Sequence, residues 1–339
     1  MTFGQAQDER AQIAVIGAGA WGTALAQLVA SDGREVLLWA YEAEVVEAIN
    51  ETHANPMFLK GAELSPTIRA TGELGDLAGI DIVLAVTPAQ VLGKVLSGLA
   101  EAPRDLVLCS KGIEAGTGRL MNDVAREACP ASEIAVLSGP TFAHEVAAGL
   151  PTAITLACSG GEAQWERLMP AIARPTFRPY YSDDVTGAEI GGAIKNVLAI
   201  ACGLVDGLGL GQNARAALIA RGYAEMLRFG EALGARPETL AGLCGLGDLV
   251  LTCSSTSSRN FSLGMALGEG GRAADLMADR TTVAEGAFTA PVLAALAEER
   301  GIAMPIVAAV NAILEGEPPR EVVAALLARP LRSEQERRP

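Results

Sequence analysis

The chain has 339 residues, of which 50% are apolar and 19% are charged. It is long enough for about two domains with sizeable cores, and this composition excludes a disordered protein. The formal net charge is −14. Nucleic acids and anionic membranes bind cationic surfaces, so we expect neither as a partner. An anionic ligand would need a local group of positive charges.

The sequence carries no evident targeting or metal-binding signal. No apolar run reaches the roughly 18 residues of a membrane span, and residues 1–10 are too polar for a signal peptide. Six cysteines form no C-x-x-C pair and there are two histidines, so we expect no metal site. Unpaired thiols without an export signal predict a cytoplasmic protein that does not insert into membranes.

Residues 12–183 alternate between short apolar runs, typical of buried parallel strands, and helix-like stretches. The predicted strands are 13–16, 36–39, 82–86, 106–109, 134–137, 153–157 and 176–181. The first predicted helix covers 23–30 and stops near Gly33. This alternation predicts an α/β Rossmann-type, doubly wound sheet.

From residue 184 the strand-like runs end and alanine- and leucine-rich helical stretches follow. The predicted helices are 187–206, 213–234, 260–268, 289–299, 304–315 and 319–328. Thr186 and Glu189 have the spacing of a capping box at the start of the first helix. We therefore expect an α/β domain over 1–186, an all-α C-terminal domain over 187–330 and a frayed tail over 331–339.

Residues 17–22, Gly-Ala-Gly-Ala-Trp-Gly, match G-x-G-x-x-G directly after the first predicted strand. Here Gly17 permits a tight turn, Gly19 lets a pyrophosphate approach the backbone, and Gly22 lets the helix pack on the strand. The loop predicts a nicotinamide dinucleotide, NAD or NADP, and an ordinary strand–helix turn is the alternative. Tyr41 and Glu42, after the second strand, do not decide between the two cofactors.

Lys195 is one of only four lysines, against 22 arginines. It lies in a mostly apolar predicted helix, one turn after Gly191 and Gly192. Two helical glycines cost roughly 2 kcal/mol, so something must approach closely. That neighbour is either a ligand or a tightly crossing helix, in which case the lysine would extend to solvent. A buried ammonium beside Lys111 would have a lowered pKa and could exchange a proton with a carbonyl oxygen.

Three further polar segments are candidates for the site. Lys111 follows one predicted strand, and residues 138–143, Ser-Gly-Pro-Thr-Phe-Ala, follow the next; an ordinary turn is the alternative for both. Asp248 could order Lys195, bind a hydroxyl or cap a helix. Arg259, before a predicted helix, resembles an anion clamp, with a solvated side chain as the alternative. We expect His144 to be a surface helix residue.

These motifs stand in the order seen in NAD(P)-dependent glycerol-3-phosphate dehydrogenase, and residues 12–328 closely resemble its soluble bacterial form. The resemblance implies reversible reduction of dihydroxyacetone phosphate to sn-glycerol 3-phosphate, which supplies phospholipid synthesis. It implies Lys195 as the proton donor and acceptor. The implied substrate contacts are Lys111, Gly139, Thr141, Lys195, Asp248, Ser258, Arg259 and Asn260. The implied cofactor contacts are Gly17, Gly19, Ala20, Trp21, Gly22, Tyr41, Lys111, Ala143, Arg259, Val283 and Glu285.

The sequence departs from the family at Tyr41, where many members carry a basic residue, so NADPH preference stays open. A β-hydroxyacid dehydrogenase is one alternative, but it would place an asparagine where Ala199 stands. A non-catalytic nicotinamide-binding sensor is the other, but it would not need Lys195, Asp248 and Arg259 together. A homodimer is compatible with this architecture.

Overall fold

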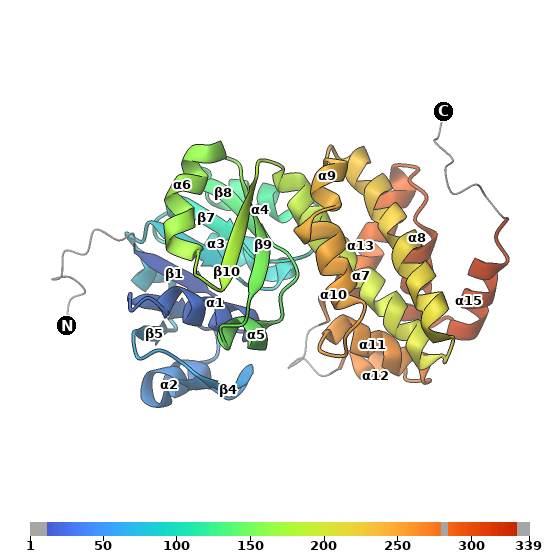
Figure 1. The fold of residues 1–339 in the computed structure, drawn as a ribbon, viewed down its shortest axis with the longest axis horizontal. Helices are drawn as coiled ribbons and strands as arrows, with labels where there is room; N and C mark the ends of the chain where they lie inside the picture. Colours follow the sequence, from blue (N-terminus) through green and yellow to red (C-terminus); the bar gives the residue numbers. More distant parts are fainter. Residues whose placement is uncertain (1–11, 279–283, 331–339) are drawn as a thin grey trace.

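The computed structural model describes residues 12–278 and 284–330. An α/β domain and a helical domain lie side by side along the long axis of the molecule (Figure 1). The last strand ends at Ser182 and the first helix of the second domain begins at Val185. The predicted cofactor contact Val283 and the predicted frayed tail, 331–339, lie outside the described residues.

The first domain is built on an eight-stranded sheet in the order β10-β9-β8-β7-β6-β1-β2-β5, parallel except between β8 and β9. Its strands are β1 (Ile13–Ile16), β2 (Val36–Trp39), β5 (Ile68–Thr71), β6 (Ile82–Ala85), β7 (Asp105–Leu108), β8 (Glu133–Ser138), β9 (Thr152–Cys158) and β10 (Phe177–Ser182). The seven predicted strands are confirmed. A separate hairpin joins β3 (Ala54–Asn55) and β4 (Leu59–Glu63).

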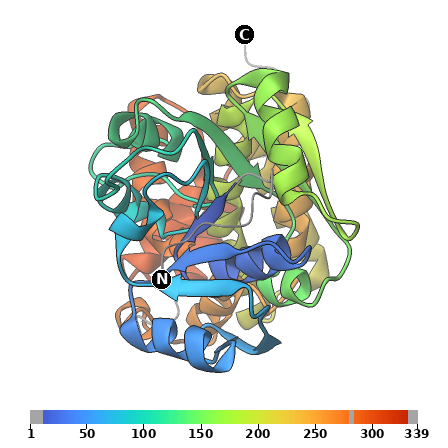
Figure 2. The same cartoon turned by 90° about the vertical axis from the view of Figure 1, so that its left-hand side faces the viewer.

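Helices cover both faces of this sheet, which confirms the doubly wound fold. The helices are α1 (Ala20–Ala30), α2 (Ala43–Thr52), α3 (Leu92–Leu96), α4 (Met121–Ala128), α5 (Ala143–Ala147) and α6 (Gly161–Ile172), with 3-10 turns η1 (Leu74–Leu77) and η2 (Ala89–Val91). Val15 packs in the core beneath α1 and α6, whereas its neighbour Ile16 packs in the core beneath α3 and α4. Figure 2 shows these two helical layers on opposite sides of the sheet.

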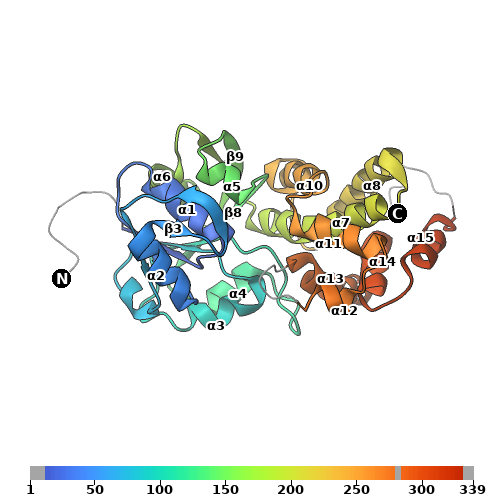
Figure 3. The same cartoon turned by 90° about the horizontal axis from the view of Figure 1, so that it is seen from below.

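The second domain is entirely helical in its described part. Its elements are α7 (Val185–Gly207), α8 (Gly211–Ala232), α9 (Pro237–Leu240), the π-helical turn η3 (Leu243–Gly247), α10 (Asp248–Thr252), α11 (Arg259–Gly268), α12 (Ala273–Leu276), α13 (Glu285–Glu299), α14 (Pro305–Leu314) and α15 (Pro319–Leu327). Helix α7 runs from the sheet into this domain (Figure 3). Gly203 of α7 and Gly264 of α11 let the two helices touch, because a Cβ at either would collide with the other backbone.

The start of α7 corrects one prediction. The capping box of Thr186 and Glu189 is wrong, because α7 begins two residues earlier and Asp184 is its N-cap. The Asp184 carboxylate accepts a hydrogen bond from the backbone N–H of Gly187 at 2.8 Å. The carboxylate of Glu189 instead accepts a hydrogen bond from the backbone N–H of Asn122, at 2.6 Å. Glu189 thereby ties α7 to α4 of the first domain.

Helix α7 also corrects the expectation that no stretch is apolar and long enough to cross a membrane. It has 23 residues, and its most apolar window has a mean hydropathy of 1.5. That window is entirely buried inside the protein. The apolar composition of α7 therefore serves the core of the helical domain, where the helix packs against neighbours on all sides.

Candidate active site

The glycine loop between β1 and α1 has the three steric features that the sequence predicts. Gly17 has φ +107°, and a Cβ there would lie 2.9 Å from the carbonyl oxygen of Val86. A Cβ at Gly22 would collide with the carbonyl of Gly17, so this glycine lets α1 pack closely on the loop. A Cβ at Gly19 would meet no atom within 4 Å. The loop is closely packed at Gly17 and Gly22 but has open space at Gly19, which fits the approach of a pyrophosphate.

Other predicted cofactor contacts lie around this loop. Ala20 and Trp21 begin α1, and the indole Nε1 of Trp21 is buried without a hydrogen-bond partner among the described residues. Tyr41 lies just beyond β2 and is 84% exposed. Ala143 is the first residue of α5, the helix after β8, and is partly buried. His144 follows it and is exposed, as predicted.

Lys195 lies on α7 and is only 8% exposed. Its Nζ donates hydrogen bonds to Asp248 Oδ1 at 3.0 Å and to Thr252 Oγ1 at 2.9 Å. An ammonium group has three hydrogens. The third has no acceptor within the described part of the chain, so it is available to a bound ligand. The prediction that Asp248 could order Lys195 agrees with this geometry.

Thr252 is a member of this cluster that the sequence predictions did not include. Its hydroxyl lies 3.1 Å from Asp248 Oδ1 and accepts a hydrogen bond from Lys195. Both Asp248 and Thr252 are on α10, four residues apart and therefore on one face of the helix. That spacing, beside an acidic site candidate, is the signal that could have identified Thr252.

Lys111 reaches the same carboxylate from the other domain. Its Nζ lies 2.6 Å from Asp248 Oδ2 and also donates to the carbonyl of Gly139 at 3.3 Å. The hydroxyl of Thr141 contacts the same Gly139 carbonyl at 3.4 Å. The loops after β7 and β8 therefore meet at the start of α10. The structure brings together four predicted site residues: Lys111, Gly139, Thr141 and Asp248.

Burial and charge act in opposite directions on this cluster. Burial lowers the pKa of Lys195, the carboxylate of Asp248 opposes that shift, and the ammonium group of Lys111 adds to it. Burial alone would raise the pKa of Asp248, but the two lysines outweigh it and hold the pKa below its usual value. Asp248 is thus an anion near neutral pH, while Lys195 loses its proton more easily than an exposed lysine.

The two glycines one turn before Lys195 lie in close contact with other parts of the protein. A Cβ at Gly191 would collide with the backbone carbonyl of Cys244 in η3. A Cβ at Gly192 would lie 3.0 Å from Ser138 Oγ and 3.2 Å from Lys111 Cγ. The close approach is therefore made by neighbouring backbone and by the stem of Lys111. The alternative of a close protein neighbour is therefore right about what approaches these glycines. It is wrong about Lys195, which is buried and does not extend to solvent.

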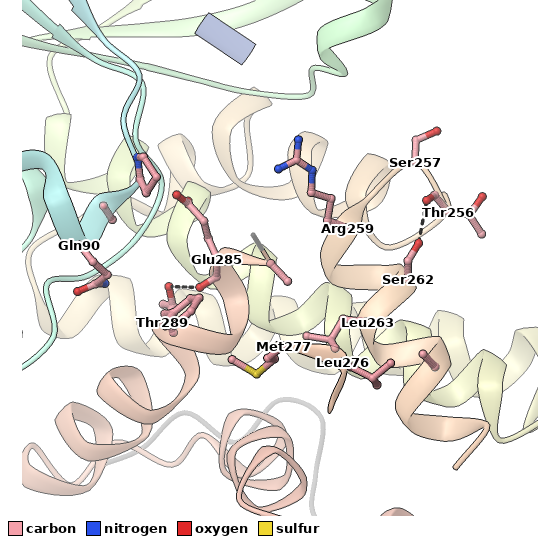
Figure 4. A pocket seen from close by; sticks show the side chains of 15 residues that line it. Gln90, Thr256, Ser257, Arg259, Ser262, Leu263, Leu276, Met277, Glu285 and Thr289 are labelled. Carbon is pink, nitrogen blue, oxygen red and sulfur yellow. Dashed lines mark hydrogen bonds between the residues drawn. The ribbon is translucent and has the colours of Figure 1, made fainter. Parts of the chain in front are cut away.

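A cavity of about 820 Å³ lies between η2 of the first domain and helices α11 to α13. Arg259 at the start of α11 and Glu285 at the start of α13 project into it (Figure 4). Burial raises the pKa of Glu285 to about 7, opposed by a hydrogen bond from the backbone N–H of Ala89 and by the charges of Lys111, Lys195 and Arg259. The charges of the three cations thus favour the anionic form of Glu285.

Two other predicted substrate contacts are engaged by the protein itself. The Ser258 hydroxyl caps α11 by accepting a hydrogen bond from the N–H of Phe261 at 3.2 Å. The Asn260 amide donates to Asn196 Oδ1 at 3.0 Å and accepts from the N–H of Gly286 at 2.9 Å. Asn260 therefore joins α11 to α7 and α13.

Within the described residues, no group of three His, Cys, Asp or Glu side chains could hold a metal ion.

Comparison with known proteins identifies the family. The model "NAD-dependent glycerol-3-phosphate dehydrogenase N-terminus" matches residues 12–164, and the corresponding C-terminus model matches residues 184–324. This chain belongs to the NAD-dependent glycerol-3-phosphate dehydrogenase family. The resemblance predicted from the ordered motifs is thereby confirmed.

Individual relatives agree with the family models. The chain is 76% identical over 326 residues to glycerol-3-phosphate dehydrogenase [NAD(P)+] of Erythrobacter litoralis, covering 96% of this chain and 98% of the relative. It is 73% identical to that of Novosphingobium aromaticivorans, covering 95% and 98%. Glycerol-3-phosphate dehydrogenase from Coxiella burnetii has the same fold, with TM-score 0.89, 39% identity and coverage of 94% and 99%. These matches do not favour a β-hydroxyacid dehydrogenase or a non-catalytic sensor.

Proposed function

We propose that this glycerol-3-phosphate dehydrogenase reduces dihydroxyacetone phosphate reversibly to sn-glycerol 3-phosphate with NADH or NADPH, and that Lys195 is its acid and base. The observation that carries this proposal is the arrangement at Lys195. Asp248 and Thr252 fix two of its ammonium hydrogens, which leaves the third for a substrate oxygen. Its lowered pKa makes that proton easier to transfer.

The reaction needs a hydride, a proton and an electrophilic carbonyl. A bound nicotinamide cofactor supplies the hydride to the ketone carbon. Lys195 polarises the carbonyl and donates its proton to the oxygen, and the neutral amine that remains is held by Thr252 and Asp248. In the reverse direction the amine removes the hydroxyl proton. Lys111 and Asp248 stay charged and paired through both steps, so loss of the Lys195 proton takes the cluster from a net charge of +1 to zero.

The phosphate of the substrate is assigned to the start of α11. Arg259 projects into the cavity between the domains, and the first-turn N–H groups of a helix favour an anion. A local clamp is needed because the net charge of −14 repels a phosphorylated triose. The proposed substrate contacts are Lys111, Gly139, Thr141, Lys195, Asp248, Ser258, Arg259 and Asn260. Ser258 and Asn260 shape the helix start as well.

The cofactor is assigned to the glycine loop and the edge of the sheet beyond it. The proposed contacts are Gly17, Gly19, Ala20, Trp21, Gly22, Tyr41, Lys111, Ala143, Arg259, Val283 and Glu285. The openness at Gly19 and the unpartnered indole of Trp21 support this placement.

We also propose a domain boundary between residues 186 and 187, a cytoplasmic location without membrane insertion, a role in supplying phospholipid synthesis, and a homodimer in solution.

The test is oxidation of NADH and NADPH with three carbonyl substrates. Dihydroxyacetone phosphate should be reduced with the highest kcat/KM, and unphosphorylated dihydroxyacetone far more slowly. A short β-ketoacid, the oxidised form of a β-hydroxyacid, serves as the control for the alternative dehydrogenase. Preference for that control, or no turnover of dihydroxyacetone phosphate with either cofactor, would contradict the proposed function.

A further inference from the structure

The hairpin of β3 and β4 contributes a buried asparagine to the glycine loop. Helix α2 ends at Thr52, and the left-handed conformation of its C-cap His53, with φ +50°, turns the chain toward β3. Asn55 in β3 is fully buried. Its amide nitrogen donates hydrogen bonds to the carbonyl of Ala18 and to Thr23 Oγ1, both at 2.8 Å. Its Oδ1 accepts one from the N–H of Phe58 at 3.1 Å.

Thr23 completes a small buried network around one carbonyl. Its hydroxyl donates to the carbonyl of Ala18 at 3.1 Å and accepts from Asn55. The Ala18 carbonyl therefore receives two side-chain hydrogen bonds, one from α1 and one from the hairpin. A buried network whose members are all satisfied rigidifies the backbone that it contacts.

The held carbonyl fixes the direction of a neighbouring N–H. Ala18 C=O and Gly19 N–H belong to one planar trans peptide, so they point to opposite sides of the chain. With the carbonyl held inside by Asn55 and Thr23, the N–H of Gly19 faces the other way. Gly19 has open space where its Cβ would be, and the described residues offer its N–H no acceptor.

We propose that Asn55, with Thr23, is a positioning residue for the cofactor, because it holds the Ala18–Gly19 peptide with its N–H toward the dinucleotide pyrophosphate. This inference rests on the cofactor placement in the proposed function and names residues that contact no reacting atom. Without the amide, the peptide can rotate, and binding must then restore its orientation. Affinity for the pyrophosphate falls, and the chemical step at Lys195 is unchanged.

The test is the affinity of Asn55→Ala for NADH, which is measured by fluorescence titration in the absence of substrate. The expected dissociation constant is roughly 5- to 50-fold above that of the wild type, as for loss of a buried hydrogen bond. ADP-ribose has the pyrophosphate but no nicotinamide. Its dissociation constant, measured by calorimetry, should rise by the same factor. At saturating NADH, kcat should stay within about twofold, since the Lys195 cluster is untouched.

Gln27→Ala is the matched control. Gln27 of α1 accepts a hydrogen bond from the N–H of Ser65, just beyond the hairpin, at 2.7 Å. The side chains that donate to the Ala18 carbonyl are those of Thr23 and Asn55. If Asn55 acts only by docking the hairpin on α1, Gln27→Ala should lower the affinity for NADH as much as Asn55→Ala does. Thr23→Val, which removes only the hydroxyl, is the second test and should raise the dissociation constant in a variant of nearly unchanged shape.

Wild-type affinity in both Asn55→Ala and Thr23→Val would overturn the proposal, and so would equal losses in Gln27→Ala. If Asn55→Ala does not fold, Thr23→Val against Gln27→Ala decides the question alone. A wild type that binds NADH but does not reduce dihydroxyacetone phosphate would contradict the proposed function and leave this inference standing.

Discussion

Lys195 and Asp248 are 53 residues apart in sequence and form a buried ion pair with 3.0 Å between Nζ and Oδ1. The carboxylate also holds Lys111, so two ammonium groups share one anion. Removal of the anion would leave two buried like charges facing each other, which is far costlier than loss of an exposed ion pair. Asp248 thus sets both the position and the protonation of Lys195.

Asp248→Asn should lower kcat for ketone reduction by about 10²-fold near neutral pH. The charge of Asp248 raises the pKa of Lys195, so its removal lowers that pKa further. Ketone reduction needs the ammonium form, and activity should therefore be lost at a lower pH than in the wild type. The measurement is the pH profile of kcat. Thr252→Val, which removes a hydrogen bond without a charge, is the control and should shift the profile less; an unshifted profile in Asp248→Asn would contradict this account.

Arg259→Ala should mainly weaken recognition of the substrate phosphate. Loss of a charge-assisted hydrogen bond costs roughly 1.5–3 kcal/mol, or about 10- to 150-fold in kcat/KM for dihydroxyacetone phosphate. Unphosphorylated dihydroxyacetone never makes this contact, so its slow reduction should change far less. Arg272→Ala, which removes an exposed cation of the same domain, controls for net charge. Equal losses for both ketones would assign Arg259 to the cofactor or to the fold.

Tyr41→Arg should shift cofactor preference toward NADPH. Tyr41 lies directly after β2 and is largely exposed, so a guanidinium there has room to pair with the 2′-phosphate. Because the site is open to solvent, we expect roughly a tenfold change in the NADPH/NADH ratio of kcat/KM. Tyr41→Leu removes the ring without adding charge and should leave the ratio nearly unchanged. The same ratio in Tyr41→Arg and the wild type would place Tyr41 away from the ribose.

Glu189→Gln should remove a pH-dependent loss of stability. Burial raises the pKa of Glu189 to about 8, opposed by the hydrogen bond from the N–H of Asn122. A raised folded-state pKa means that the native state holds the proton more tightly. The contribution of Glu189 to the free energy of unfolding is complete below the pKa of the unfolded state, about 4.3. It is lost as the pH rises through the folded-state pKa, about 8. The slope is at most about 1.4 kcal/mol per pH unit.

Urea unfolding of the wild type and of Glu189→Gln at about pH 6 and pH 8.5 measures this difference. The variant should lose less stability between the two conditions than the wild type does. Parallel losses would show that Glu189 does not titrate in this range in the folded protein.

Much of the fold follows from local patterns. The runs at β1 and β2 are buried at every position and read as strands from their letters alone. The edge strand β5 escaped prediction because it carries the exposed Arg69 between buried residues. The capping box failed because two competent caps, Asp184 and Thr186, stand close together, and the tertiary contact between Glu189 and Asn122 decides between them.

The site was predictable by residue type but not by geometry. Lys111, Lys195 and Asp248 were each recognisable, yet Lys111 and Asp248 are 137 residues apart, and only the fold brings both lysines to one carboxylate. The network at Asn55 is of the same kind, since it joins the glycine loop to a hairpin whose strands are too short and too polar to predict. The glycines beside Lys195 showed that something approaches, but not what.

The central claim is that Lys195 moves the proton, and single-turnover kinetics of Lys195→Ala with saturating NADH test it most directly. We expect at least about a 10²-fold loss of the rate of dihydroxyacetone phosphate reduction, with the NADH dissociation constant nearly unchanged, because the glycine loop is in the other domain. Lys195→Arg should fail as well, since a guanidinium does not release its proton near neutral pH. Retention of more than about a tenth of the wild-type rate by Lys195→Ala, with NADH bound normally, would contradict the account.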